Sequence, residues 1–63
     1  MKRELYFGLK DIERAKSRQE ARRLEQELID RMKAGLRKRT MTVQEVCDCA
    51  RKGSRLMREK GWA

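Results

Sequence analysis

ERAKSRQEARR, residues 13–23, holds five Arg or Lys and two Glu, and its only apolar side chains are those of Ala. The stretch contains neither Gly nor Pro, the residues that interrupt a helix most strongly. Upstream of it the first Gly is Gly8, and Asp11 and Glu13 suit the positive end of a helix dipole. The stretch is therefore expected to be the middle of one helix that begins near residue 9.

The residues after this stretch give the same helix its apolar face. Side chains suited to a core recur at steps of four residues, at Leu24, Leu28, Met32 and Leu36. Gly35 can adopt the left-handed conformation that ends many helices, with the next residue folding back. The sequence therefore predicts a first helix over residues 9–36, and it leaves open a start nearer Lys2 and a continuation through residues 37–39.

A second helix is predicted by MTVQEV, residues 41–46. Thr42 and Glu45 have the spacing of a capping box, in which each side chain accepts a hydrogen bond from the backbone N–H of the other residue. Met41 and Val46 occupy the two positions of a hydrophobic staple, which fixes how the chain enters the helix. Two independent signals thus place the start of this helix at residue 43.

The second helix is expected to end near Lys60. Gly61 can supply the left-handed residue of a Schellman motif, in which Trp62 folds back on Met57. The apolar positions mostly follow helical spacing, at Val43, Val46, Cys47, Ala50, Leu56 and Met57. The sequence therefore predicts a second helix over residues 43–60, followed by a short tail over residues 61–63.

Two helices joined by the basic residues 37–42 predict an antiparallel helical hairpin, so the expected fold class is all-α. At 1.5 Å per residue the first helix is about 40 Å long and the second about 27 Å long. Residues 1–8 and the start of the first helix then extend beyond the second helix and carry an uncovered apolar cluster: Leu5, Tyr6, Phe7, Leu9 and Ile12. Residues 1–63 are predicted to be one small domain, completed by dimerisation into a helical bundle or by docking on a partner.

Charge dominates the composition. Lys and Arg number 18 against 10 Asp and Glu, which gives a net charge of +8 in 63 residues. A field of this strength favours a polyanionic partner such as nucleic acid. No apolar run approaches the roughly 18 residues of a membrane span, and the first residues lack the apolar core of a signal peptide. Two Cys without a secretion signal indicate a reducing compartment, so we expect a cytoplasmic protein that does not contact membranes.

Three basic stretches are candidates for contact with nucleic acid. Arg side chains bind phosphate oxygens in a forked geometry, and each neutralised phosphate releases counterions. On a continuous first helix the cations from Lys10 to Arg22 recur at steps of four and form one stripe. In the hairpin, Arg55 would lie beside Arg22. The predicted nucleic-acid-binding residues are Arg14, Arg18, Arg22, Arg23, Arg37, Lys38, Arg39, Arg51, Arg55 and Arg58.

The same cations also fit a solvated helix face. Acidic residues are interleaved with them and can form salt bridges at helical spacing: Glu20, Glu25, Glu27 and Asp30. Like charges at i,i+4 spacing oppose the folding of a free helix, and this favours a contact surface over an idle solvated face. The sequence is therefore consistent with a contact surface and also with a solvated face.

Catalysis and metal binding have little support in the sequence. The chain has no His, the commonest general base, and no Ser or Cys in a recognisable nucleophile arrangement. Side chains two residues apart on a helix diverge by about 200°, so Cys47 and Cys49 cannot easily share one metal ion. We predict no enzyme activity, no metal, no cofactor and no small-molecule substrate. Cys47 is expected to be half-buried on the apolar stripe, with Cys49 at its flank.

Two functions fit these observations. The first is a small nucleic-acid-binding protein, a regulatory or accessory factor that contacts the phosphates of DNA or RNA. The alternative is an adaptor or inhibitor, of the kind that phages and mobile elements encode, which docks its apolar N-terminal cluster on a larger acidic protein. In both cases we expect a homodimer or another protein partner, with the interface at Leu5, Tyr6, Phe7, Leu9 and Ile12.

Overall fold

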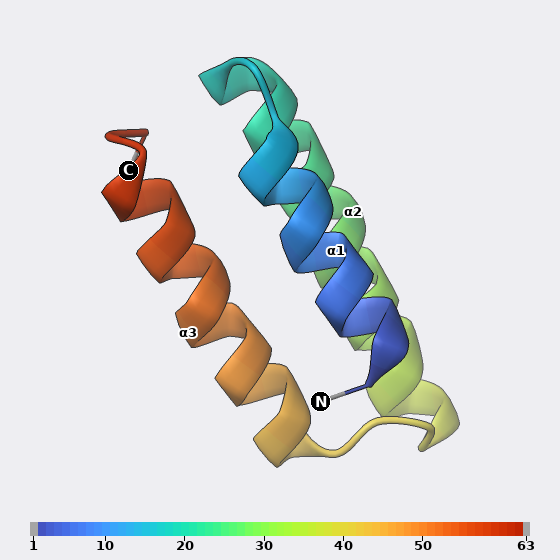
Figure 1. The fold of residues 1–63 in the computed structure, drawn as a ribbon. Helices are drawn as coiled ribbons and strands as arrows, with labels where there is room; N and C mark the ends of the chain where they lie inside the picture. Colours follow the sequence, from blue (N-terminus) through green and yellow to red (C-terminus); the bar gives the residue numbers. More distant parts are fainter. Residues whose placement is uncertain (1, 63) are drawn as a thin grey trace.

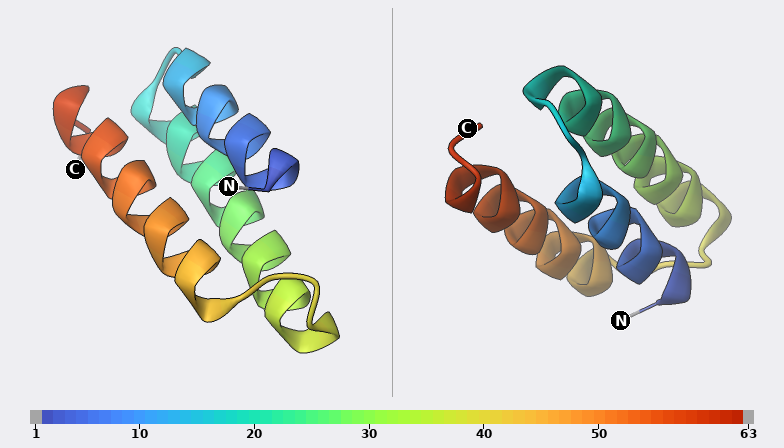
Figure 2. Two further views of the ribbon diagram at one scale, coloured as in Figure 1. Left: turned by 60° about the horizontal axis from the view of Figure 1, so that its bottom comes forward. Right: turned by 45° about the horizontal axis from the view of Figure 1, so that its top comes forward.

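Three α-helices make up the fold, and the chain reverses its direction twice between them. In the computed structural model, which describes residues 2–62, they are α1 (Arg3–Arg14), α2 (Arg18–Lys38) and α3 (Val43–Glu59). α1 and α3 run in the same direction and α2 runs against both, with α1 packed on both of its neighbours (Figure 1 and Figure 2). The predicted all-α class is confirmed, and residues 2–62 contain no strand. The predicted two-helix hairpin is wrong.

The first reversal falls inside the stretch that was expected to be continuous helix. Ser17 is extended, with φ −144° and ψ 162°, and its hydroxyl accepts a hydrogen bond from the backbone N–H of Glu20 at 3.1 Å. The Glu20 carboxylate accepts one in turn from the N–H of Lys16, also at 3.1 Å. These bonds satisfy backbone donors that the start of a helix leaves without partners. The helix predicted over residues 9–36 is therefore wrong, because two helices meet there.

α1 covers the α2–α3 pair with its own apolar face. Leu5 and Ile12 are fully buried and Leu9 nearly so, which removes all three from the predicted apolar overhang. Steps of four and three residues put them on one side of α1, the pattern of an amphipathic helix. The buried hydrophobic side chains of the core are Leu5, Leu9, Ile12, Ala15, Ala21, Leu28, Met32, Met41, Cys49 and Met57. Dimerisation stays a prediction, and of the cluster on which it was based Tyr6 and Phe7 remain exposed.

α2 does not end at Gly35 and follows instead the predicted alternative of a helix that continues into the basic residues after it. The helix continues past this residue, and the left-handed residue is Arg39, with φ 61°. The N–H groups of Arg39 and Thr40 donate to the carbonyls of Leu36 (3.2 Å) and Gly35 (2.9 Å), which is the pattern of a Schellman motif. Gly35 is needed instead for close packing, because a Cβ built there would lie 2.6 Å from the sulfur of Met41.

Both ends of α3 lie where the sequence placed them. The N–H of Glu45 donates to the Thr42 hydroxyl at 3.1 Å, and the N–H of Thr42 donates to the Glu45 carboxylate at 2.9 Å, so the capping box is confirmed. At the other end Gly61 is left-handed, with φ 74°, and the N–H of Trp62 donates to the Met57 carbonyl at 2.8 Å. The predicted Schellman motif is also confirmed.

The buried face of α3 is rotated relative to the predicted one. Cys49, Gly53 and Met57 are buried at steps of four residues, whereas Cys47 is exposed and Val43 keeps 67% of its surface accessible. The predicted placement of the two Cys is therefore wrong. The physical reason is that Gly53, a buried member of this face that packs near Leu9 of α1, contributes no apolar side chain to the sequence pattern.

The predicted terminal segments are described in part. Within the predicted segment 1–8, residues 3–8 belong to α1, and Met1 lies outside the described residues, as does Ala63 of the predicted tail 61–63. Among the helices described, none combines the length and the apolar character needed to cross a membrane.

Candidate nucleic-acid interface

The cations predicted to bind nucleic acid are all exposed, but they do not form the stripe that was expected on α1 and α2. The chain reversal at residues 15–17 puts Lys10 and Arg14 on α1 and puts Arg18 and Arg22 on α2. The single stripe predicted from Lys10 to Arg22 is therefore wrong, because two antiparallel helices cannot continue one helical face.

The two reversals divide these cations between the ends of the bundle. The α1–α2 turn and the C-terminal end of α3 lie at one end, and the α2–α3 connection lies at the other, along a molecule 33 Å long (Figure 1). Arg14, Arg18 and Arg58 belong to terminal turns at the first end. The predicted residues Arg37–Arg39 lie at the opposite end. The two groups are therefore separate surfaces.

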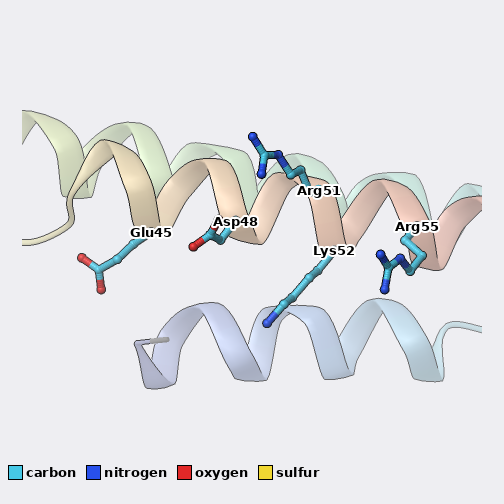
Figure 3. A pocket seen from close by; sticks show the side chains of 5 residues that line it. All are labelled: Glu45, Asp48, Arg51, Lys52 and Arg55. Carbon is cyan, nitrogen blue, oxygen red and sulfur yellow. The ribbon is translucent and has the colours of Figure 1, made fainter.

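The outer face of α3 carries a row of three cations. Arg51, Arg55 and Arg58 are all exposed and follow one another at steps of four and three residues, so they share one side of the helix. Ala50 and Ser54 lie beside them, and these five residues line a shallow hollow. The small side chains of Ala and Ser leave little bulk between the three Arg, although Figure 3 shows Arg51 extending away from α1 and Arg55 on the side toward α1. We call these three residues the α3 arginine row.

Few cations of the molecule are paired with an acid. Within the described part of the chain there is one ion pair, between Lys10 Nζ and Glu13 Oε2 at 3.7 Å. Some interleaved acids have other partners, since Glu20 caps the start of α2 and Asp30 accepts a hydrogen bond from the Gln26 amide at 3.2 Å. The interpretation of the basic faces as solvated and laced with salt bridges is therefore weakened.

Charge is separated along α3. Figure 3 shows its acidic side chains on the first turns and its basic side chains further along: Glu45, Asp48, Arg51, Lys52 and Arg55. This order complements the helix dipole, whose N-terminal end is positive and whose C-terminal end is negative. The backbone N–H of Thr42, hydrogen-bonded to the Glu45 carboxylate, holds the pKa of that carboxyl below its ordinary value. The ionised acid is thus held in the cap, where it lines one pocket with Arg51 and Arg55 of the α3 arginine row.

A second surface, which the sequence did not predict, is a groove between α1 and α3. Its lining comes from both helices and comprises Tyr6, Leu9, Lys10, Glu13, Lys52, Arg55 and Leu56. Lys10 lies over the Tyr6 ring, with its Nζ 5.6 Å from the ring centroid. Lys10 and Lys52 were missed as site residues because they come together only when α1 packs beside α3.

The two thiols have different surroundings, and neither is in a disulfide. Cys49 is fully buried, and burial raises the pKa of its thiol, whereas Cys47 is exposed. A raised pKa disfavours the thiolate, which is the nucleophilic and metal-binding form. Among residues 2–62 no group of three or more His, Cys, Asp or Glu is placed to hold a metal ion.

Comparisons with family models, with curated proteins and with solved structures gave no match for this chain. The function proposed below is therefore inferred from the molecular surface: from which charged side chains are exposed together and which apolar groups lie between them.

Proposed function

We propose that this protein binds double-stranded nucleic acid, with the outer face of α3 against the phosphate backbone. The observation that carries the proposal is the α3 arginine row, Arg51, Arg55 and Arg58, which is exposed and which makes no ion pair within residues 2–62. The net charge of +8 adds a long-range field that draws a polyanion toward the molecule. In this proposal the protein is an accessory or regulatory factor that contacts phosphates rather than base edges.

The spacing of the α3 arginine row suits a phosphate backbone. From Arg51 to Arg58 the helix rises by about 10 Å, and one strand of a B-form duplex advances by about 3.4 Å per phosphate. Each guanidinium group can therefore reach a different phosphate. Ala50 and Ser54 have no bulk that would hold the backbone away from the helix.

Cations of α2 support the same surface. Glu25 of α2 and Ser54 of α3 line one shallow depression between these two helices. Arg22 lies about one turn before Glu25, and Arg58 lies one turn after Ser54, so the antiparallel arrangement brings the two Arg to the same level of the bundle. Arg22 thus extends the α3 arginine row, whereas Arg37, Lys38 and Arg39 at the opposite end act in this proposal by long-range attraction.

A duplex fits this surface better than a single strand. Proteins that bind single strands stack several bases on exposed aromatic rings. Here the aromatic side chains are not grouped along the α3 arginine row, since Tyr6 and Phe7 belong to α1 and Trp62 packs against the core. The alternative function predicted from sequence, docking through an apolar N-terminal overhang, has less support, because Leu5, Leu9 and Ile12 are buried inside the chain's own core and only Tyr6 and Phe7 of that cluster stay exposed.

The proposal is tested by a salt titration of binding to a fluorescently labelled 20-base-pair duplex, as DNA and as RNA, followed by anisotropy. Contact with three or more phosphates predicts that log K falls with log salt with a slope of about −2.7 or steeper. The duplex with the higher affinity at moderate salt identifies the preferred polymer. Absence of binding to both duplexes at low salt would overturn the proposal.

A further inference from the structure

The groove between α1 and α3 has an apolar floor that has no role in the proposed binding of phosphates. The buried members of its lining are Leu9, which keeps 8% of its surface accessible, and the partly buried Leu56. The ring of Tyr6 forms part of one side and is 49% exposed. Phosphates gain nothing from such an apolar floor, so an occupant that fits it has apolar groups of its own.

The rim of the groove is cationic. Lys10 comes from α1, and Lys52 and Arg55 come from α3; Figure 3 shows Lys52 extending from α3 across toward α1. The one acid in the lining, Glu13, is engaged with Lys10 at 3.7 Å. Lys52 and Arg55 make no ion pair within the described part of the chain. The occupant that complements this rim is therefore negatively charged.

An exposed aromatic pair extends the apolar surface beyond the groove. Phe7 is 54% exposed and contacts Tyr6 edge to face, with ring centroids 5.7 Å apart. Exposed aromatic rings next to cations provide apolar contact area at a low entropic cost, as in many protein interfaces. A bound partner can thus bury Tyr6 and Phe7 in addition to the floor.

A second copy of this chain does not meet these requirements. Two copies that met through this groove would bring two cationic rims together, and each copy carries a net charge of +8. Like charges that face each other across an interface oppose association. An occupant that carries both apolar and acidic side chains avoids this repulsion and can also cover the apolar floor.

We propose that the groove between α1 and α3 docks an acidic amphipathic helix of another protein, with its apolar face on Leu9, Leu56 and Tyr6 and its carboxylates at Lys10, Lys52 and Arg55. This is recognition of a helix in a groove, with apolar anchors at i, i+3, i+4 and i+7. Its apolar anchors lie on α1 and on the inner side of α3, apart from the phosphate contacts, and Arg55 is the residue that the two proposed surfaces share.

The test is anisotropy of a labelled synthetic 18-residue peptide that has Leu at helical i, i+3, i+4 and i+7 spacing and Glu at most other positions. A second peptide of the same composition, with its order scrambled so that no apolar face forms, controls for charge alone. The two matched protein variants are Lys52→Glu in the groove and Lys33→Glu on α2, which change the net charge equally at exposed positions. Tyr6→Ala removes the aromatic side of the groove.

We expect the amphipathic peptide to bind at least tenfold more tightly than the scrambled one. Lys52→Glu and Tyr6→Ala should each weaken binding at least fivefold, and Lys33→Glu less than twofold. Circular dichroism melting of each variant establishes that it is folded. Equal affinity for both peptides, or equal effects of the two Lys variants, would overturn the proposal. It also fails if Tyr6→Ala weakens binding to a nucleic-acid duplex and leaves binding of the peptide unchanged, since the groove would then belong to the nucleic acid.

Discussion

The hydroxyl of Ser17 accepts a hydrogen bond from the backbone N–H of Glu20, at 3.1 Å, and this contact begins α2 three residues after α1 has ended. Because the chain reverses its direction between α1 and α2, the apolar side of α1 packs into the core of the same chain. The small buried residues Ala15 and Ala21 on either side of the turn let the two helices approach each other. The three-helix bundle depends on this reversal.

Ser17→Ala should lower the free energy of unfolding by about 1 kcal/mol, the usual cost of removing an N-cap hydroxyl. Ser17→Asp should retain most of the stability, because aspartate is an equally good N-cap. Urea unfolding followed by circular dichroism measures both. Ser54→Ala, at an exposed position inside α3, is the matched control and should not destabilise. If the two Ala variants were equally stable, Ser17 would not hold the turn.

The glycines at 35 and 53 should respond in opposite directions to Ala. A Cβ at Gly53 would lie 3.7 Å from Leu9, an ordinary contact, so Gly53→Ala should raise stability by up to about 1 kcal/mol through helix propensity. A Cβ at Gly35 would lie 2.6 Å from the sulfur and 2.7 Å from the Cγ of Met41, so Gly35→Ala should destabilise, by about 1 to 3 kcal/mol for an overpacked core. Thermal melts of the pair give the comparison, and a stabilising Gly35→Ala would contradict the packing of Met41 on α2.

Acid should weaken the start of α3. The Thr42 N–H lowers the pKa of Glu45 in the folded state from its ordinary value of 4.5, so ionised Glu45 stabilises the fold above that pH. This stabilisation is lost as the pH falls below about 4.5 and through the lower pKa of the folded state. Glu45→Gln cannot titrate, so the stability advantage of the wild type over this variant should shrink between pH 7 and pH 3 in urea unfolding. An advantage that is the same at both pH values would show that the capping carboxylate is not ionised preferentially in the fold.

The two thiols should react at very different rates. Cys47 is exposed and should be modified quickly by a thiol reagent at neutral pH. Cys49 is fully buried and its thiol pKa is raised, so it should react only as fast as the protein opens. Counting thiols over time distinguishes a fast and a slow phase, and Cys47→Ser should remove the fast one. Two equal rates would contradict the inward orientation of Cys49.

The parts of the fold that depend on local hydrogen bonds could be predicted from the sequence. The capping box of Thr42 and Glu45 and the left-handed Gly61 involve residues close in sequence, and both were found where expected. Ser17 and Glu20 have the same spacing as Thr42 and Glu45, but they lie among charged residues with no apolar run directly after them. The spacing of this cap is therefore present in the sequence, but no apolar periodicity marks it as the start of a helix.

Other features depend on tertiary contacts and could not be predicted in the same way. Glycine commonly ends a helix, yet Gly35 lies inside α2, where it packs against Met41. The left-handed residue is Arg39 instead. The exposure of the basic residues could be predicted from their charge. Which of them lie together could not be predicted, because that depends on where the chain turns. The groove between Lys10 and Lys52 requires two helices whose contact the sequence did not predict.

The central claim, that the α3 arginine row contacts a phosphate backbone, is tested most directly by two triple variants of equal charge. Arg51, Arg55 and Arg58 are changed to Gln in one, and Lys33, Arg37 and Lys38, all exposed on α2 toward the opposite end, are changed to Gln in the other. The measurement is the salt dependence of duplex binding by anisotropy. We predict that the α3 variant reduces the log–log slope by about 2.7 and weakens binding by roughly two orders of magnitude at 0.1 M salt, while the α2 variant changes the slope by less than about 1. Equal losses in the two variants would show that net charge alone, and not the α3 arginine row, attracts the nucleic acid.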